Sequence, residues 1–383
     1  MDALTTPSNW QRVRLGDVAE IIGGGTPSTQ VTSFWNGSIN WFTPTEIGIT
    51  KYVYKSQRTI TPLGLKKSSA KLLPIRTILL TSRASIGDCA ILKVAATTNQ
   101  GFQSLIPLEK INNEFLYYLM LTLKNKLLKL ASGSTFLEVS PNKIKNLLIP
   151  LPPLNEQIAI ANILSDLDRY LYSLDALILK KESVKKALSF ELLSQRKRLK
   201  GFNQAWQRVR LGDIAEIKRG VRITKNELDV FGKYPVVSGG VGFLGYTNNF
   251  NRYENTITIA QYGTAGYVNF QKNKFWANDI CFCVYPNKDV IKNIFLYYFL
   301  KVNQNYLYEI SNRNATPYSI SKDKILDFEI LLPPINEQIA IANVLSALDN
   351  EITSLKNKKR QFGNIKKALN HDLMSAKIRV LKK

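Results

Sequence analysis

The sequence predicts an α+β protein built as a tandem repeat, with two strand-rich domains and two long antiparallel coiled-coil helices related by a pseudo-two-fold axis. Three observations predict it. Two blocks of sequence occur twice in the same order, the strand-rich stretches between them are dissimilar, and a long helical pattern closes each half. A chain of 383 residues is also too long for one ordinary hydrophobic core.

The repeated blocks establish the duplication. Residues 10–21 return as residues 206–217 with a single substitution. Residues 151–168 return as residues 332–349 with three substitutions. Because the order within each half is the same, the two halves are copies of one unit.

The stretches between the blocks differ in sequence and in length, as residues 22–80 and 218–255 illustrate. A common frame with two different inserts indicates one scaffold that presents two different recognition surfaces. We expect a first recognition domain at 1–150, a first spacer helix at 151–200, a second recognition domain at 201–331 and a second spacer helix at 332–383.

Each half opens with strand patterns. Residues 76–86 and 256–270 are β-branched and apolar with Gly and Ser breaks, which is typical of strands. A helix is then expected from Glu114 to about Leu130, where apolar residues recur at helical spacing. Its counterpart is expected from about Ile294 to Tyr308.

Each half ends in a pattern for one long helix. Proline pairs at 152–153 and 333–334 suit positions just before a helix, and Asn155 and Asn336 are the expected N-caps. From Asn155 the apolar periodicity continues for about 44 residues, or roughly 65 Å. The second helix is expected from about Asn336 to Arg379. A narrow apolar stripe needs a partner helix, and the other copy is the nearest candidate. The alternative is that each helix packs only on its own domain.

The charge balance favours a polyanionic partner. Fifty-two Lys and Arg against 29 Asp and Glu give a net charge of +23. A merely solvated basic surface is the alternative. No run of about 18 apolar residues is present, so we expect no membrane span. The first residues lack a signal-peptide pattern, and three cysteines cannot form a disulfide framework, so we expect a cytoplasmic protein.

Several catalytic and cofactor motifs are absent or out of context. Residues 240–245 match the glycine pattern of dinucleotide loops, but residues 246–250 do not continue as an apolar helix. The chain has no phosphate-binding loop and no Asn/Asp-Pro-Pro-aromatic methyltransferase motif, and a Ser/His/Asp triad has no local support. Cys281 and Cys283 should face one side of a strand, and His371 should lie on the surface or seam of the second long helix. We therefore expect no catalytic residue and no metal site.

The repeated motifs resemble the specificity (S) subunits of type I restriction–modification systems. The resemblance rests on the Leu-Pro-Pro-Leu/Ile-Asn-Glu-Gln-Ile-Ala-Ile-Ala segments at 151–161 and 332–342 and on the Arg-Leu-Gly-Asp openings. Residues 98–102 and 375–380 resemble the same family, so the likeness covers essentially the whole chain.

The resemblance implies two target recognition domains, two conserved spacer helices and no catalysis by this chain. The implied partners are double-stranded DNA, two methylation subunits and restriction subunits, and those subunits would carry S-adenosylmethionine, ATP and Mg. The implied DNA site is bipartite, with a gap set by the helices and commonly near one DNA turn of roughly 34 Å. Because the inserts differ, we expect two different half-sites rather than a palindrome.

Base and phosphate recognition needs hydrogen-bonding side chains on loops. For each candidate alone, strand-end or turn chemistry explains the residue equally well. We expect phosphate contacts from Lys143 and Lys324, which are equivalent in the repeat, so that alanine at either lowers the salt slope by about one. The predicted DNA-binding residues are Ser82, Arg83, Asn99, Gln100, Ser134, Thr135, Asn142, Lys143, Gln261, Tyr262, Asn312, Arg313, Asn314, Lys322 and Lys324. The predicted partner-docking residues are Asn155, Glu156, Gln157, Asn336, Glu337 and Gln338.

Two other function classes stay open at this point. The chain could be a restriction or methyltransferase subunit with its own active site, or a protein-only assembly scaffold. Within the resembled family, it could also serve methylation alone. S-adenosylmethionine binding by the isolated chain would favour the enzyme, and salt-dependent DNA retention would argue against the scaffold.

Overall fold

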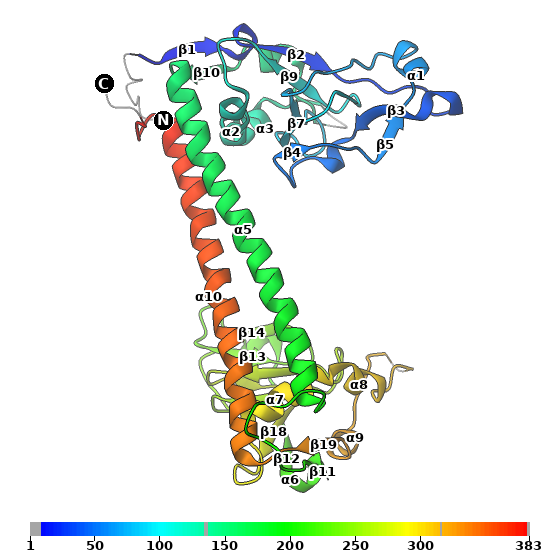
Figure 1. The fold of residues 1–383 in the computed structure, drawn as a ribbon, viewed down its shortest axis with the longest axis vertical. Helices are drawn as coiled ribbons and strands as arrows, with labels where there is room; N and C mark the ends of the chain where they lie inside the picture. The colour runs from blue at the N-terminus through cyan, green and yellow to red at the C-terminus, as the bar shows by residue number, and fades with distance from the viewer. Residues whose placement is uncertain (1–8, 134–136, 315, 381–383) are drawn as a thin grey trace. The chain divides into compact units, whose positions relative to one another are not determined.

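The protein is described here from a computed structural model that covers residues 9–133, 137–314 and 316–380. Two compact units are present (Figure 1). The first combines Met1–Leu174 with Lys358–Lys383, as far as these ranges are described, and the second is Asp175–Asn357. The units differ from the four segments expected from the sequence, because each unit takes part of both long helices.

The two repeated blocks pair with each other in the first unit. Strand β1 (Gln11–Arg14) in the first block runs antiparallel to β10 (Leu148–Leu151), which leads into the second block. The following 3-10 turn, η1 (Leu15–Asp17), joins the same pairing, because the Leu15 amide donates to the Leu147 carbonyl at 2.9 Å. The start and the end of the recognition insert are thereby held side by side.

Two sheets form the insert of the first unit. A five-stranded sheet has the order β2-β9-β6-β7-β4, and a three-stranded sheet has the order β5-β3-β8. All neighbours are antiparallel except β4 with β7 and β3 with β8. The strands are β2 (Ala19–Gly23), β3 (Trp35–Phe42), β4 (Tyr52–Val53), β5 (Arg58–Ile60), β6 (Ile78–Leu80), β7 (Cys89–Leu92), β8 (Ala96–Thr98) and β9 (Gln103–Pro107).

The expected helix over 114–130 is two helices. Helix α2 (Asn113–Thr122) begins where the Asn112 side chain accepts the Phe115 amide at 3.0 Å, and α3 (Lys124–Leu130) follows. The break falls at Leu123, and Lys124 pairs with Asp88 beyond β6. Side chains 115–120 are buried, and Figure 1 shows α2 and α3 beside β7. The remaining helices of this unit are α1 (Pro62–Lys66), α4 (Pro141–Lys145) and the 3-10 turns η2 (Thr32–Phe34) and η3 (Pro44–Glu46).

The second unit repeats the frame with a different insert. Strand β11 (Gln207–Arg210) pairs antiparallel with β19 (Glu329–Leu332), as β1 pairs with β10. The insert has a four-stranded sheet of order β12-β18-β15-β16 and a three-stranded sheet of order β14-β13-β17. The strands are β12 (Ala215–Arg219), β13 (Tyr234–Val237), β14 (Phe243–Thr247), β15 (Thr256–Ala260), β16 (Val268–Gln271), β17 (Trp276–Ala277) and β18 (Cys281–Pro286).

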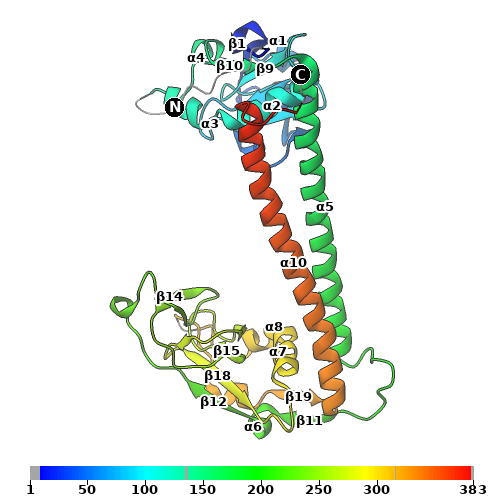
Figure 2. The ribbon, with the colours of Figure 1, turned by 90° about the vertical axis from the view of Figure 1, so that its left-hand side faces the viewer.

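The helices of the second unit follow those of the first. The expected helix over 294–308 is again divided, into α7 (Asn293–Val302) and α8 (Gln304–Glu309). Figure 2 shows both between the strands of this unit and the long helices. Expected strand residues 256–270 divide likewise into β15 and β16, and only β6 forms a strand of more than an isolated bridge within 76–86. The other helical elements are α6 (Leu211–Ile214), α9 (Lys322–Leu326) and η4 (Lys225–Glu227).

The long helices are α5 (Leu154–Leu193) and α10 (Ile335–Met374). Both begin directly after the proline pairs, so Asn155 and Asn336 lie in the first turn and their prediction as N-caps was wrong. Both helices also end about five residues earlier than expected. Gln195 and Ala376, just beyond the last turns, have φ of +63° and +58°, a left-handed conformation that stops a helix.

In each unit α5 and α10 pair antiparallel. In the first unit Asp168 pairs with Lys366, and Glu156 pairs with Arg379, so partner numbers rise as residue numbers fall. In the second unit Lys185 pairs with Asp349 at 2.5 Å. Each helix also packs on its own domain, because Ile160 of α5 belongs to the first unit's hydrophobic core and Leu345 of α10 to the second unit's core. The expected pairing is therefore confirmed, and the alternative of packing on the domain contributes as well.

Among the described residues, no helix combines the length and the apolar character needed to cross a membrane.

Candidate nucleic-acid interface

A buried glutamate joins both ends of the frame in the first unit. The side chain of Glu156, in the first turn of α5, is 2% exposed. It accepts the indole N–H of Trp10 at 3.1 Å and two bonds from the Arg379 guanidinium, at 2.7 and 3.0 Å. These hydrogen bonds raise the pKa of Arg379. We call this set of three residues the clasp of the first unit.

The second unit has the same clasp. Glu337, with a fully buried side chain, accepts the indole N–H of Trp206 at 2.9 Å and two bonds from Arg198, at 3.0 and 2.5 Å. Arg198 follows α5 as Arg379 follows α10. Each clasp therefore ties the start of one long helix to the tail of the other, next to the first strand of the repeat.

The predicted docking residues are mostly committed to contacts inside the chain. Gln157 accepts the Asn112 amide at 2.8 Å and donates to the Pro152 and Lys110 carbonyls. Gln338 makes the equivalent bonds to Lys292, Val290 and Pro333. Glu156, Gln157, Glu337 and Gln338 are at most 1% exposed, which leaves Asn155 and Asn336 as the accessible members of the predicted set.

The candidate DNA-binding residues of the first half gather around three adjoining segments. The Ser82 amide donates to the Gly101 carbonyl at 2.8 Å, next to Asn99 and Gln100. The Val139 amide donates to the Ser82 carbonyl at 3.1 Å, which brings in the segment from Ser132 to Lys143. We call residues 81–88, 99–101 and the described part of 132–143 the first loop cluster.

Side chains in the first loop cluster are partly tied to one another. Arg83 pairs with Glu138 at 2.8 Å, and both are partly exposed. Ser82 is 1% exposed, and its hydroxyl donates to the Gly101 carbonyl. The Asn99 side chain accepts the Gly101 amide, and the Gln100 side chain accepts the Thr26 hydroxyl. Ser134 and Thr135 lie outside the described residues.

The second half builds an equivalent cluster from different residues. The Gln261 amide donates to the Ile280 carbonyl at 2.9 Å, and the Ile320 amide donates to the Gln261 carbonyl at 3.0 Å. Tyr262 and Asn312 both bridge to Ser319. We call residues 261–266, 278–280 and the described part of 312–324 the second loop cluster. Asn312, Arg313 and Asn314 are exposed there.

Equivalent glycines close the first segment of each cluster. Gly87 and Gly266 have φ of +88° and +86°, where a side chain would be strained. A Cβ on Gly266 would also lie 2.8 Å from the Leu307 carbonyl oxygen. The same turn is therefore preserved under two different sets of presented side chains.

Lys143 and Lys324 hydrogen-bond the helix ends that lead into the two loop clusters. The Lys143 ammonium donates to the Leu130 carbonyl at 2.8 Å and to the Ser132 hydroxyl at 3.0 Å. The Lys324 ammonium donates to the Ile310 carbonyl at 2.7 Å. In both units the lysine fixes the end of the helix that leads into the cluster. Phosphate contact by these lysines stays a prediction. Asn142 and Lys322 are exposed on α4 and α9.

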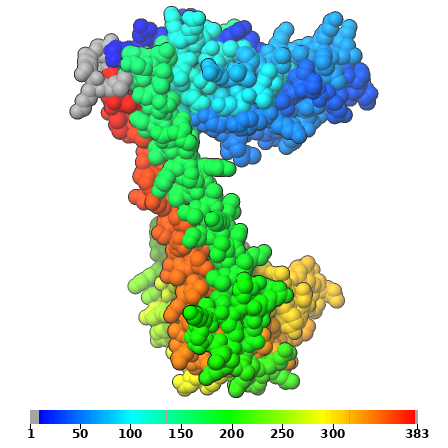
Figure 3. Space-filling model, in the orientation of Figure 1, coloured from blue at the N-terminus to red at the C-terminus, as the bar shows by residue number. Residues whose placement is uncertain are grey.

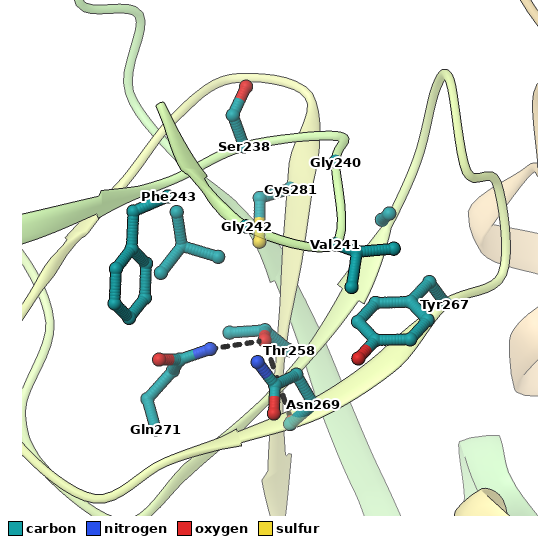
Figure 4. Close-up of a pocket in the computed structure, with 12 residues that line it drawn as sticks. Ser238, Gly240, Val241, Gly242, Phe243, Thr258, Tyr267, Asn269, Gln271 and Cys281 are labelled. Carbon is teal, nitrogen blue, oxygen red and sulfur yellow. Dashed lines mark hydrogen bonds between the residues drawn. The ribbon is translucent and has the colours of Figure 1, made fainter. Parts of the chain in front are cut away.

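The rejected motifs have plain structural explanations. The loop containing Gly240 and Gly242 leads into strand β14 rather than a helix. Figure 4 shows the pocket under this loop, whose volume of about 10 Å³ suits one water molecule. Cys281 and Cys283 share one buried cluster on β18, as expected, and His371 lies exposed on α10. No group of three metal-ligating side chains occurs among the described residues.

Sequence reasoning missed the clasps. Trp10 and Trp206 begin the repeated blocks, but the sequence pattern gave them no role. Arg198 and Arg379, which complete the clasps, were not recognised as equivalent positions of the repeat. The signal was present, because Ser-x-basic-x-Arg-apolar occurs at both 194–199 and 375–380. Asn278, the counterpart of Asn99, was also missed. It is buried and bonds Ile223 and Ser238, so its role is structural.

The family model for the type I restriction modification DNA specificity domain matches residues 7–181 and 203–361. The chain belongs to this specificity-domain family. The two matched segments correspond to the two copies of the repeat, so each loop cluster lies within one specificity domain, and each clasp adds an arginine from the tail of the other helix.

Two curated specificity subunits are similar to this specificity-domain chain. The subunit of the MjaIX restriction enzyme of Methanocaldococcus jannaschii is 34% identical over 242 residues, which is 58% of this chain and 55% of that protein. The EcoR124I/EcoR124II subunit of Escherichia coli is 36% identical over 161 residues, or 40% of each chain. The chain thus spans about half the length of these relatives.

The specificity-domain fold extends over the chain. The crystal structure of the type I restriction–modification S subunit from M. genitalium has a TM-score of 0.67 to this chain. It covers 97% of this chain and 98% of its own at 20% identity. At this identity the likeness establishes the fold alone.

Proposed function

We propose that this chain is the DNA-reading subunit of a type I restriction–modification complex, in which each unit reads one half of an asymmetric bipartite site. One observation carries the proposal: two identical frames present two different loop clusters. The clasps, the supporting lysines and the turn glycines are equivalent in both units. The partly exposed residues of the clusters are not, since Arg83 corresponds to Tyr262 and Glu138 corresponds to Ser319.

Charge and side-chain chemistry support DNA as the ligand. The net charge of +23 provides the attraction to phosphates that supplies most non-specific affinity. The clusters offer Arg, Asn and Gln side chains, which pair with guanine and adenine edges in the major groove. A protein-only scaffold explains neither feature.

We propose that the methylation subunits dock on exposed apolar side chains of the long helices. Leu154 and Ile158 are 46% and 41% exposed and lie four residues apart on α5. Ile339 occupies the position of Ile158 on α10 and is 39% exposed. These residues flank the buried clasp glutamates. Because the glutamates are buried, we propose these exposed apolar residues as the docking contact in their place. Figure 3 shows a large uncovered face of α5 in green.

In this proposal the chain selects the site and its partners perform the chemistry. Methyl transfer from S-adenosylmethionine belongs to the methylation subunits. ATP-driven translocation and Mg-dependent cleavage belong to restriction subunits, where the system has them. The chain itself binds none of these cofactors.

The test is to co-purify the chain with its methylation subunit and methylate a random-sequence DNA library. We expect methylated adenines within one asymmetric, gapped motif. A perfect palindrome would contradict the reading of one different half-site by each unit. Stable assembly without sequence-restricted methylation would leave only the scaffold.

A further inference from the structure

Arg313 in the second loop cluster is held in a fixed position by its neighbours. Its guanidinium carbon lies 5.5 Å from the ring centroids of both Tyr308 and Tyr318. Its Nε donates to the Tyr308 carbonyl at 3.1 Å. The two cation–π contacts and this bond restrain the arginine without using its two terminal nitrogens. Restraint before binding lowers the entropy cost of a specific contact.

The charge of Arg313 is not neutralised within the described part of the chain. No described carboxylate lies within ion-pair distance of it. Arg83, the arginine of the first loop cluster, is paired with Glu138 at 2.8 Å. The second cluster has Ser319 where the first has Glu138, so the counter-charge is missing at that position. The two clusters therefore present different electrostatic surfaces.

The loop around Arg313 is anchored close to its base. Asn312 and Ser319 exchange backbone bonds of 2.7 and 3.1 Å, and the Asn312 side chain accepts the Asn314 amide at 3.0 Å. The Gly263 amide donates to the Tyr318 carbonyl at 3.0 Å. Arg313 thus projects from a turn bonded to the neighbouring segment of the cluster, and it is exposed.

A planar guanidinium with two free terminal nitrogens matches one base edge. Guanine presents two acceptors, O6 and N7, in the major groove, and arginine donates to both at once. A phosphate also accepts two bonds from the arginine fork, so the fork alone does not distinguish the two acceptors. The base is favoured over the phosphate because Arg313 belongs to the part of the second loop cluster that differs between the units, whereas a phosphate contact carries no sequence information.

We propose that Arg313 specifies a guanine in the half-site read by the second unit. This inference rests on the proposed function and adds the chemical identity of one base to it. In the described part of the first loop cluster, the arginine is Arg83, which is paired to a glutamate.

The first experiment compares methylation motifs of complexes carrying Arg313→Lys, Arg313→Ala and the unaltered chain. We expect Arg313→Ala to abolish the preference for guanine at one position of one half-site, and Arg313→Lys to weaken it, because lysine donates to guanine without the planar fork. The other half-site should stay unchanged and report that the complex is assembled. Arg208→Lys, an exposed arginine of the same unit paired with Glu329, is the matched control and should leave the motif intact.

A second experiment isolates the base contact. Replacing the guanine by 7-deazaguanine removes the N7 acceptor, and we expect the unaltered complex to lose affinity on the order of 10-fold, within the range of a good bidentate contact. The Arg313→Ala complex, which has no side-chain donor at this position, should lose no further affinity. This binding measurement tests the contact between Arg313 and guanine even where a variant complex no longer methylates DNA.

The outcomes separate the two proposals. An unaltered complex without a gapped motif rejects the proposed function itself. A gapped motif whose guanine survives Arg313→Ala, or equal loss on 7-deazaguanine in the unaltered and Arg313→Ala complexes, overturns the role of Arg313 alone. Loss of affinity for all sequences, with the guanine preference retained, would make Arg313 a phosphate contact and also overturn it.

Discussion

Individual residues of the clasps connect parts of the chain that are far apart in sequence. Trp10 and Arg379 meet on one carboxylate, and Trp206 and Arg198 meet on another. Burying a carboxylate is costly unless it is paired and hydrogen-bonded. Each glutamate has three donor contacts, so the buried charge is compensated, and each donor becomes structurally important.

Trp10→Phe should destabilise the first unit while keeping the aromatic ring. The variant loses one hydrogen bond to a buried carboxylate, which is worth roughly 1.5–3 kcal/mol. Unfolding in urea, followed by fluorescence and circular dichroism, measures the change. Trp276→Phe is the control, since that half-buried indole donates at 2.8 Å to the neutral Val221 carbonyl and should cost about 1 kcal/mol. Equal losses in the two variants would argue against a special role for the clasp.

Alkaline pH should destabilise the protein, beginning near pH 9. Burial raises the pKa of the Cys89 thiol to about 12, from an ordinary value of 9.0. Burial also raises the pKa of Tyr297 to about 12 and of Tyr118 further. A group with a raised folded pKa stabilises the protein below its unfolded pKa, and that contribution is lost as the pH rises through the folded value.

The Cys89 contribution can be separated from that of the tyrosines. Between pH 9 and 10 the unfolded thiol ionises before the unfolded tyrosines do, so the free energy of unfolding should fall by up to about 1.4 kcal/mol per pH unit. Cys89→Ala should flatten this part of the profile, whatever its stability at pH 7. Urea titrations at half-unit pH steps provide the measurement, and parallel profiles for the two proteins would disprove the assignment.

At the scale of elements, the sequence was most informative where periodicity was long. Both long helices were predicted with starts correct to one residue, because each follows a proline pair and continues with a long apolar periodicity. Boundaries that depend on tertiary contacts were missed. No proline marks the helix breaks at Leu123 and Asn303 or the division of 256–270 into two strands. Contacts with neighbouring segments determine these boundaries.

The residue types of the candidate site could be predicted from the sequence, but their arrangement in space could not. Sequence alone collected Ser82, Asn99 and Lys143, and the structure brings their segments together through the Gly101 and Ser82 carbonyls. Whether a side chain is presented or used internally depends on those contacts. The buried Glu156 shows the limit, since a polar residue in a strongly repeated motif was expected to face a partner.

Exposed apolar side chains on the long helices should control assembly. Ile158→Glu or Ile339→Glu places a charge in the proposed contact, and we expect retention by the methylation subunit to fall about 10-fold or more, since burying an isoleucine is worth roughly 1.5–3 kcal/mol. Pull-down titration gives the affinity. Ile49→Glu, at an 86% exposed position, is the control and should leave retention unchanged. Undiminished retention of both helix variants would place the contact elsewhere.

At the scale of the whole molecule, the net charge of +23 should make DNA binding strongly salt-dependent. With 6–10 phosphate contacts, affinity for duplex DNA should fall about 10³- to 10⁵-fold between 50 and 200 mM salt. Fluorescence anisotropy with a labelled duplex measures the slope. Lys143→Ala and Lys324→Ala should each lower it by about one if these lysines also reach phosphates. Salt-independent retention would remove DNA as the partner.

The division of the chain into units also has a consequence for its biosynthesis. The second unit is the continuous stretch 175–357, whereas the first needs residues 358–380 to supply its share of α10 and Arg379. A ribosome adding 5–20 residues per second needs roughly 10–40 s to make the intervening stretch. During that time the first half of α5 has no partner helix and Glu156 has no arginine. The part of the chain synthesised first is therefore completed last, and its apolar seam is the segment most in need of protection in the cell.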